Sequence, residues 1–368
     1  LKDLDFEIHT YQNDSWDLTV PAYRVDVTRP IDVIEEILRI YGLNTVEIPQ
    51  KWNLSLSPNK DQRTDYNKEA CAEFLVGRGF FEVMNNSLTK KHYSTYLDAS
   101  FGAAIGLLNP LSQDLGIMRQ SLVFGLLENL AYNQNRQQTD LQFFEFGQDY
   151  QLHNELRQET QRLALALMGK QSPANWNNTA AVDHEFYSLK KEVYAVLERL
   201  GLSSNLKEYS AQHLLFEQGV GIERAGKTLV EFGQISVLLQ QEFDLKQNVY
   251  YAQFDWTALA SEGQQERIRY QEVPKTFAVR RDLSLLLDIN TTYQELLQSA
   301  RGAETKLLQN IELFDVYEGK NLPEGKKSYA LAFYLQDKQQ TLSETQIEKA
   351  MQRIIKALET DCAAQLRN

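Results

Sequence analysis

The chain has 368 residues, of which 43% are hydrophobic and 11% aromatic, which is enough apolar surface for a globular fold and excludes a disordered or collagen-like chain. Its 38 Lys and Arg against 50 Asp and Glu give a net charge of −12, which argues against a surface built throughout to bind a nucleic-acid backbone. There are two cysteines and no apolar run long enough for a membrane span or a signal peptide, which favours a soluble, cytoplasmic protein without a disulfide framework.

The length predicts two or three domains, at roughly 150 residues each. We expect segments of residues 1–50, 51–272 and 273–368, because a polar linker (LSLSPNKDQRTD) follows the first and a change of charge marks the last. The tail from Pro274 holds 13 Lys and Arg and 13 Asp and Glu, so all the net acidity lies before it. The chain begins at Leu1 rather than Met, which predicts a fragment of something longer.

The first segment is predicted to run from an extended stretch, VPAYRVDV (20–27), into a helix that starts near Thr28 and Pro30. Apolar residues recur there at helical spacing, and Gly42 supplies a stop. The four residues expected on the buried face are Ile34, Ile37, Leu38 and Tyr41.

Four carboxylates gather around the start of this helix. Asp26 ends the extended stretch, and Asp32, Glu35 and Glu36 follow on the helix at spacings that bring side chains together. The negative charges of these carboxylates repel one another unless a cation is present. Hard divalent ions such as Mg²⁺ take oxygen ligands. The alternative is a solvated helix surface with light salt bridges, in which Arg39 takes part.

The second segment alternates helical periods with runs of β-branched and aromatic residues. The expected helices are 61–77, 121–135 and 185–200. The expected strands include 141–146, 162–168, 228–235 and 249–256. Several of these strands follow one another without helical crossovers, which predicts a largely antiparallel sheet with helices and therefore an α+β fold.

The sequence offers little sign of catalysis in this segment. It has no Gly-rich phosphate loop, and the five His of the chain show no metal-ligand spacing. Ser121 and the other serines lack a strand-turn-helix nucleophile elbow, so acyl transfer has no support. GVGIERAG (219–226) has the glycine density of a tight turn, and we expect it to be one.

The tail has the clearest pattern. DLSLLLDI (282–289) predicts a strand, Thr292 with Glu295 predicts a capped helix, two further runs predict a hairpin, and Ser343 with Gln346 caps a last helix before a short apolar end. The buried stripe of the last helix is expected to hold Ile347, Ala350, Met351, Ile354 and Leu358. The order βαββαβ is that of the ferredoxin-like sandwich.

Cations of the tail fall in two groups. They are Lys275, Arg280 and Arg281 before the first strand, and Lys320, Lys326 and Lys327 on the hairpin turn. With Phe277, Tyr317 and Tyr329 nearby, and with both groups at one edge, they would offer cations for phosphates and rings for unpaired bases. A solvated rim is the alternative.

Three stretches together resemble the β subunits of bacterial phenylalanyl-tRNA synthetases. PAYRVDVTRPIDVIEEILRIYGLNTVEIP (21–49) is similar to their metal-carrying module. NPLSQDLGIMRQSLVFGLLENLAYNQNR with LQFFEFGQDY (109–150) is similar to their synthetase-like core. The tail, from VPKTFAVRRDLSLLLDI through ELFDVYEGKNLPEGKKSYALAFYLQDKQQTLSETQI, is similar to their ferredoxin-fold anticodon-binding domain. The resemblance implies an α+β multidomain chain with a class II synthetase-like antiparallel core, a ferredoxin-like tail, and a missing N-terminal half that carries the tRNA-binding and editing modules.

The resemblance also implies site residues. The family's Mg²⁺ ligands fall on Asp26, Asp32, Glu35 and Glu36, where the ion is structural, at the contact with the α subunit. Catalysis in a class II synthetase needs an Arg-containing strand followed by an acid, and a second Arg after a Gly-rich turn. In this chain that pattern is degraded. Residues 118–121 (MRQS) lack the acid, and 219–224 only loosely match the second Arg element. We therefore expect a non-catalytic copy that pairs with an α subunit, partly through the helix at 61–77, while ATP is used at the α subunit.

The function implied by the resemblance is a part of phenylalanine–tRNA ligase that binds tRNA(Phe) at its anticodon region within an α₂β₂ heterotetramer. The tail residues expected to contact tRNA are Lys275, Arg280, Arg281, Lys326 and Lys327. Two alternatives stay open: an Mg²⁺-dependent phosphoryl-transfer enzyme that uses the carboxylates, and a ferredoxin-like regulatory protein that binds a small ligand.

Overall fold

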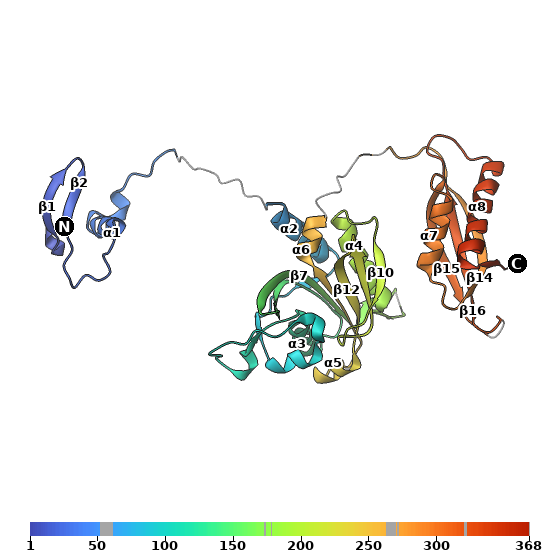
Figure 1. Ribbon diagram of the computed structural model, residues 1–368, viewed down its shortest axis with the longest axis horizontal. Coiled ribbons are helices and arrows are strands. Elements are labelled where there is room, and N and C mark those ends of the chain that lie inside the picture. The colour runs from blue at the N-terminus through green and yellow to red at the C-terminus, as the bar shows by residue number, and fades with distance from the viewer. Residues whose placement is uncertain are drawn as a thin grey trace. The chain divides into compact units, whose positions relative to one another are not determined.

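The computed structural model describes residues 1–51, 62–172, 174–177, 179–262, 270, 272–319 and 322–367. The chain forms two compact units, Leu1–Gly263 and Gln264–Asn368 (Figure 1). Lys320 and most of the linker expected at 54–65 lie outside the described residues. Among the helices of the described ranges, none has the length and apolar content that crossing a membrane requires.

The N-terminal segment consists of a hairpin and a helix. Its elements are the short 3-10 helix η1 (Lys2–Leu4), the strands β1 (Glu7–Gln12) and β2 (Ser15–Thr19), the helix α1 (Pro30–Tyr41) and the short η2 (Leu43–Thr45). Asn13 and Asp14 join the strands with φ of 52° and 56°. Such positive φ values at both central residues are those of a type I′ hairpin turn, and Asn and Asp tolerate them well.

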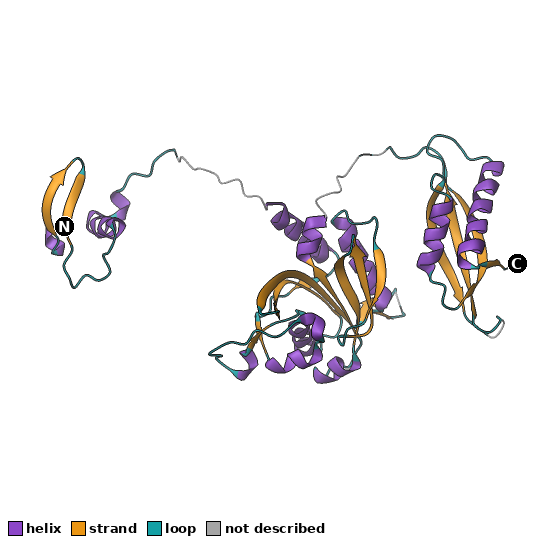
Figure 2. Ribbon diagram, viewed as in Figure 1, coloured by secondary structure: helices purple, strands orange, loops and turns teal. Residues whose placement is uncertain are grey.

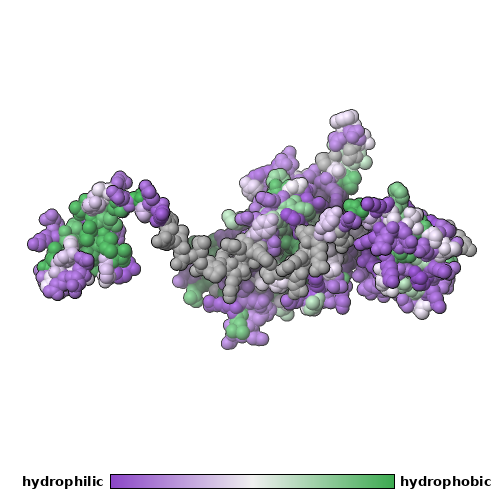
Figure 3. All heavy atoms as spheres, turned by 90° about the horizontal axis from the view of Figure 1, so that it is seen from above, coloured by the Kyte–Doolittle hydropathy of each residue, from purple (hydrophilic) through white to green (hydrophobic). Residues whose placement is uncertain are grey.

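Two predictions for this segment are wrong. Residues 20–27 form successive turns rather than an extended stretch, with the Arg24 amide bonded to the Pro21 carbonyl at 2.9 Å. The apolar face of α1 is not buried: Ile34 is 47% exposed and Tyr41 58%. Figure 3 accordingly shows hydrophobic side chains gathered on the surface of this segment. The described segment is too short to cover that face, and Glu36 is the buried residue of α1.

A seven-stranded sheet forms the centre of the larger unit, in the order β10-β11-β12-β13-β7-β6-β3 (Figure 2). Its strands are β3 (Phe81–Glu82), β6 (Leu141–His153), β7 (Leu156–Met168), β10 (Lys207–Ala211), β11 (Phe216–Arg224), β12 (Lys227–Ile235) and β13 (Val249–Asp255). Neighbouring strands are antiparallel except β3 and β6, which are parallel. The predicted α+β architecture is confirmed.

Helices and short strands surround this sheet, and three of the helices were predicted. They are α2 (Gln62–Gly77), β4 (Leu88–Thr89), η3 (Lys91–Tyr96), η4 (Ala99–Phe101), η5 (Gln113–Leu115), β5 (Ile117–Met118), α3 (Val123–Gln134), β8 (Lys170–Ser172), β9 (Val182–Asp183), α4 (Phe186–Arg199), α5 (Val237–Glu242) and α6 (Trp256–Glu262). The three helices expected from periodicity correspond to α2, α3 and α4.

Both faces of the sheet are buried, which explains why β7 reads as a continuous apolar run. Leu163, Leu165 and Leu167 join a core with residues of α2, α4 and α6. Ala164 and Ala166 point the other way, into a second core with α3 and α5. Glu145 on β6, which pairs with Ala164, lies on this second face, and the cavity beside α4 discussed below lies on the first.

The expected turn at 219–226 is instead strand β11, and only Ala225 and Gly226 form a turn, with φ of 50° and 79°. Its glycines allow close approach within the sheet rather than a reversal of the chain. A Cβ on Gly221 would lie 2.1 Å from the Tyr209 ring of the neighbouring strand β10.

The tail unit has the predicted βαββαβ order: β14 (Val279–Asp288), α7 (Tyr293–Ala303), β15 (Leu308–Tyr317), β16 (Lys326–Leu335), α8 (Glu344–Cys362) and β17 (Gln365–Leu366). The sheet order is β15-β16-β14-β17. Both predicted capping boxes are present, and all five residues of the expected α8 stripe are buried. The core of this unit lies between one face of the sheet and the two helices.

Phe333 on β16 is fully buried in that core, whereas Phe314 on β15 is about half exposed. Phe333→Ala should therefore lower the free energy of unfolding of the tail unit by about 3 to 5 kcal/mol, and Phe314→Ala by less than about 1 kcal/mol. Urea denaturation followed by resolved amide signals of each unit measures this. If Phe333→Ala destabilised the larger unit by the same amount, the account of two separately folded cores would be wrong.

Candidate functional site

Arg24 lies between two of the four residues predicted to bind metal. Its guanidinium contacts Asp26 at 2.9 Å and the buried Glu36 at 2.8 Å. Glu36 also accepts a hydrogen bond from Arg39 at 2.8 Å. Arg24 holds the pKa of both carboxyl groups below their ordinary values. Asp26 and Glu36 are thus brought together by an arginine.

Asp32 has a different role, at the N-terminus of α1. Its carboxylate accepts hydrogen bonds from the backbone amides of Thr28 and Arg29, at 3.0 and 2.8 Å, and pairs with the Arg29 guanidinium at 3.0 Å. The side-chain hydrogen bond from Arg29, followed by these amides, lowers the pKa of Asp32 to about 2. Glu35, the fourth predicted ligand, is exposed.

We call Asp26, Asp32, Glu35 and Glu36 the α1 carboxylates. Four negative charges here meet three positive ones, on Arg24, Arg29 and Arg39. Within the ranges that the structure describes, no group of three or more His, Cys, Asp or Glu is arranged to hold a metal ion. As arranged, the α1 carboxylates fit arginines rather than Mg²⁺, and the metal assignment stays a prediction.

In the tail, two adjacent arginines point to opposite faces of β14. Arg280 pairs with Asp282 at 2.7 Å, and its guanidinium carbon lies 5.1 Å from the centre of the Phe314 ring. Arg281 pairs instead with Glu344, at the start of α8, at 2.6 Å. Arg280 therefore lies on the sheet face opposite the helices, which we call the open face.

The expectation that the tail cations meet at one edge is wrong. Strand register places Lys326 opposite Asp288, at the other end of β14 from Arg280, roughly 26 Å away along the strand. Lys327 is buried, with its ammonium 4.8 Å from the centre of the Tyr329 ring. Lys275 is exposed ahead of β14, as is Phe277.

The open face has small residues in its middle and rings around them. Ser328 and Ala332 of the central strand β16 lie on it. Tyr317 sits directly opposite Ser328, and the Arg367 guanidinium carbon lies 5.7 Å from the centre of its ring. The sequence pattern missed Arg367. Arg367 follows the short last strand, β17. Because β17 pairs with β14, the Arg367 side chain reaches across the sheet to Tyr317.

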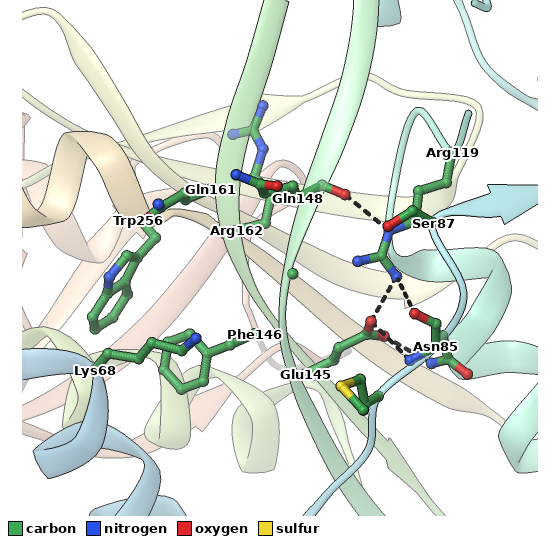
Figure 4. A pocket seen from close by; sticks show the side chains of 12 residues that line it. Lys68, Asn85, Ser87, Arg119, Glu145, Phe146, Gln148, Gln161, Arg162 and Trp256 are labelled. Carbon is green, nitrogen blue, oxygen red and sulfur yellow. Dashed lines mark hydrogen bonds and ion pairs between the residues drawn. The ribbon is translucent and has the colours of Figure 1, made fainter. Parts of the chain in front are cut away.

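Arg119 follows the short strand β5 and lies against strand β6 of the central sheet. Its guanidinium pairs with the buried Glu145 at 2.6 Å and donates to the Gln148 carbonyl at 2.8 Å. It lies against Gly147, where a Cβ would be 2.2 Å from it. Figure 4 shows this group at the side of a cavity of about 370 Å³, across from Lys68 of α2.

A second cation, which is only partly buried, lines the same cavity. Arg162 on β7 contacts Asp149 at 2.6 Å and Asp255 at 3.2 Å. Asp149 is fully buried, and burial raises its pKa against the opposing effect of Arg162. Each of these two arginines is therefore engaged by a carboxylate of the chain itself, and both also line the cavity of Figure 4.

His213 connects the sheet to the loop that carries η4. Its ring nitrogens lie 2.9 Å from Asp98 and 3.1 Å from Glu231 on β12. Glu231 also accepts a hydrogen bond from Tyr209 at 2.8 Å. The Glu231 hydrogen bond, together with that to Asp98, raises the pKa of His213 to about 9. This cluster was not predicted, because its members lie far apart in the sequence.

Comparison with protein families gives two matches in chain order. Residues 21–256 match a model described as the phenylalanyl tRNA synthetase beta chain CLM domain. Residues 274–367 match a model described as the ferredoxin-fold anticodon binding domain. The predicted synthetase-like core with a ferredoxin-like tail is thereby confirmed.

Curated relatives are phenylalanine–tRNA ligase beta subunits. The chain is 43% identical to that of Bacteroides thetaiotaomicron, over 99% of this chain and 46% of the relative, and 40% identical to that of Porphyromonas gingivalis, over 100% and 46%. It thus spans about half the length of the curated relatives it matches. A solved pyrrolysyl-tRNA synthetase from Desulfitobacterium hafniense aligns with a TM-score of 0.43 and 15% identity, over 55% of this chain and 69% of that one.

The charge of His213 stabilises the fold fully below its unfolded pKa of about 6.5, and this contribution is lost as pH rises through about 9. His213→Gln should therefore be less stable than the natural chain by roughly 3 kcal/mol at pH 6, with the difference shrinking toward pH 9.5. Urea denaturation at both pH values measures it, with the exposed His9→Gln as control. A difference of equal size at both pH values would contradict this account.

Proposed function

Because the chain belongs to the phenylalanyl-tRNA synthetase β-chain family, we propose that it serves phenylalanine–tRNA ligase by assembling with a catalytic α subunit and binding tRNA(Phe). The complex would use ATP at the α subunit, in the cytoplasm, as an α₂β₂ heterotetramer. The observation that carries the proposal is the pair of family matches in chain order, which together extend over most of the chain.

The paired charges of the larger unit support a non-catalytic role for it. Activation of an amino acid with ATP needs cations that face the triphosphate. Arg119 and Arg162 are each paired with a buried carboxylate, and the guanidinium of Arg119 takes up the space above Gly147. The chain therefore positions its partners, and the α subunit performs the chemistry.

Contact with the α subunit is proposed for α2 and the strand that follows it. Four large hydrophobic side chains are exposed there: Tyr66, Val76, Phe81 and Met84. Exposed apolar side chains on neighbouring elements are typical of a protein interface. An α subunit that covers them would also lie beside the cavity at Lys68.

The open face of the tail is proposed to bind the anticodon region. Arg280 and Arg367 offer cations, and Phe314 and Tyr317 offer rings, on one side of the sheet. Single-stranded RNA loops are usually bound by stacking of unpaired bases on such rings and by contacts of cations with phosphates. Of the five residues predicted from the sequence, Arg280 fits this surface best, while Lys275, Arg281, Lys326 and Lys327 stay proposals of lower rank.

The experiment for the whole proposal is a pull-down with the intact protein that contains this chain, from an extract of its own cells. We expect an α subunit in the eluate, together with attachment of phenylalanine to tRNA. If neither the subunit nor the activity is recovered while control baits work, the proposal is wrong.

Arg280→Glu should weaken binding of the tRNA(Phe) anticodon stem-loop by about tenfold and reduce the slope of log affinity against log salt by about 1. The matched control is Arg281→Glu, which changes the neighbouring residue on the helix side of the sheet and should have a smaller effect. Fluorescence titration at several salt concentrations measures both. Equal effects of the two variants would remove the open face from the proposal.

An Mg²⁺ ion at the α1 carboxylates would have to take the place of Arg24. Arg24→Met leaves Asp26 and Glu36 without their shared cation, so Mg²⁺ affinity should rise by about tenfold. Calorimetric titration with Mg²⁺ tests this, with Arg353→Met in the tail as control. Unchanged affinity in Arg24→Met would remove these residues as Mg²⁺ ligands.

A further inference from the structure

His184 is buried between two cavities of the larger unit. It follows β9, precedes α4 and is 6% exposed. Neither of its ring nitrogens, Nδ1 and Nε2, has a hydrogen-bond partner among the described residues. A buried polar side chain without partners is uncommon in folded proteins, because each unpaired group costs about 1 to 3 kcal/mol.

The two cavities differ in their walls. One, the α4 cavity, measures about 320 Å³ and is lined by Gly77, Arg78, Gln142, Leu167, Gln171, His184, Ser188, Lys191 and Glu192. The other, the Lys246 cavity, measures about 270 Å³ and is lined by Gly169, Asp183, His184, Lys246, Gln247 and Asn248. His184 is the residue that both share.

The tautomer of His184 follows from the Lys246 cavity. Burial lowers the pKa of the imidazole, so the ring is neutral and has one donor and one acceptor nitrogen. Gln247 Oε1 is also buried without a partner, and it too needs a donor. One water in the Lys246 cavity can donate to Gln247 and to the acceptor nitrogen of His184. The N–H of His184 is then available to the α4 cavity, which the residue also lines.

The charges around the α4 cavity favour an anion. Arg78 donates from Nε and Nη2 to Glu192, at 2.5 and 2.9 Å, so this pair is neutral. Lys190 is paired with Glu208 at 2.8 Å, whereas Lys191 has no carboxylate partner among the described residues. The cavity therefore has an excess positive charge beside the His184 donor.

The carboxylates that act on His184 do not cancel this charge. Asp183 lines the Lys246 cavity, on the other side of the ring. Asp140 accepts a hydrogen bond from the Lys170 amide at 2.9 Å, and Glu192 is engaged by Arg78. Of these three carboxylates, Glu192 is the one that lines the α4 cavity, and Arg78 neutralises it.

We propose that the α4 cavity is a binding site for an oxyanion of the phosphate class, held by Lys191, the His184 N–H and the remaining donors of Arg78. The phosphate group can belong to a small molecule or to a nucleic-acid backbone, and both present the same oxygens. The site lies in the larger unit, apart from the open face of the tail, and does not depend on the function proposed above.

The test is calorimetric titration of the 368-residue chain with inorganic phosphate at low ionic strength and neutral pH. We expect saturable binding at one site, with an affinity that falls by about tenfold in Lys191→Gln. Lys246→Gln is the matched control, because it removes an exposed lysine from the other cavity and should leave the affinity unchanged. Phosphate should also shift the imidazole signals of His184 in NMR spectra, identified with His184→Gln.

The proposal is overturned if phosphate shows no saturable binding, or if Lys246→Gln weakens binding as much as Lys191→Gln does. A competing single-stranded RNA distinguishes the two sources of phosphate. Displacement of the bound phosphate by RNA supports a site for a nucleic-acid backbone, and binding that RNA does not disturb supports a site for a small phosphate compound.

Discussion

A guanidinium packed against a strand glycine determines what the larger unit can do. Arg119 is held over Gly147 by the buried Glu145, and the absence of a side chain at Gly147 is what allows the contact. Removing one partner of a buried ion pair leaves an uncompensated charge and costs about 3 to 5 kcal/mol, so the two residues depend on each other. This pair fills the sheet face with the protein's own charges, where a catalytic site would need them free.

The same principle explains the other charged groups. Glu36 is the buried residue of α1, and Arg24 and Arg39 compensate it. His213 is charged because two carboxylates face it. These charged groups are compensated from within the chain. His184 differs, because its polar atoms have no described partner, which is why the cavity beside it is the place where a ligand is inferred.

Local spacing was sufficient to predict much of the fold. The apolar run of β7, the capping boxes of α7 and α8 and the buried stripe of α8 depend on neighbours within a few residues, and all are present. Features that depend on distant partners were missed. Gly221 in a glycine-rich run signals a turn or a close approach equally well, and only the position of Tyr209 on the next strand decides between them.

The candidate sites show the same limit. The four α1 carboxylates and a salt bridge with Arg39 were found from spacing, but Arg24 was not, since it lies in a turn where an extended stretch was expected. In the tail, Arg280 and Lys326 belong to antiparallel neighbours, so the start of one strand lies opposite the end of the other. The register of the strand pairing therefore places Arg280 and Lys326 far apart, and residue spacing alone does not reveal that register.

The central claim is that Arg119 and Arg162, the two arginines at this sheet face, are engaged by carboxylates of the chain itself and do not bind a triphosphate there. Equilibrium titration of the purified chain with Mg²⁺-ATP tests it most directly. The account predicts no saturable binding at the sheet face of Arg119. Saturable binding of ATP that Arg119→Gln abolishes, in a variant that stays folded, would contradict it.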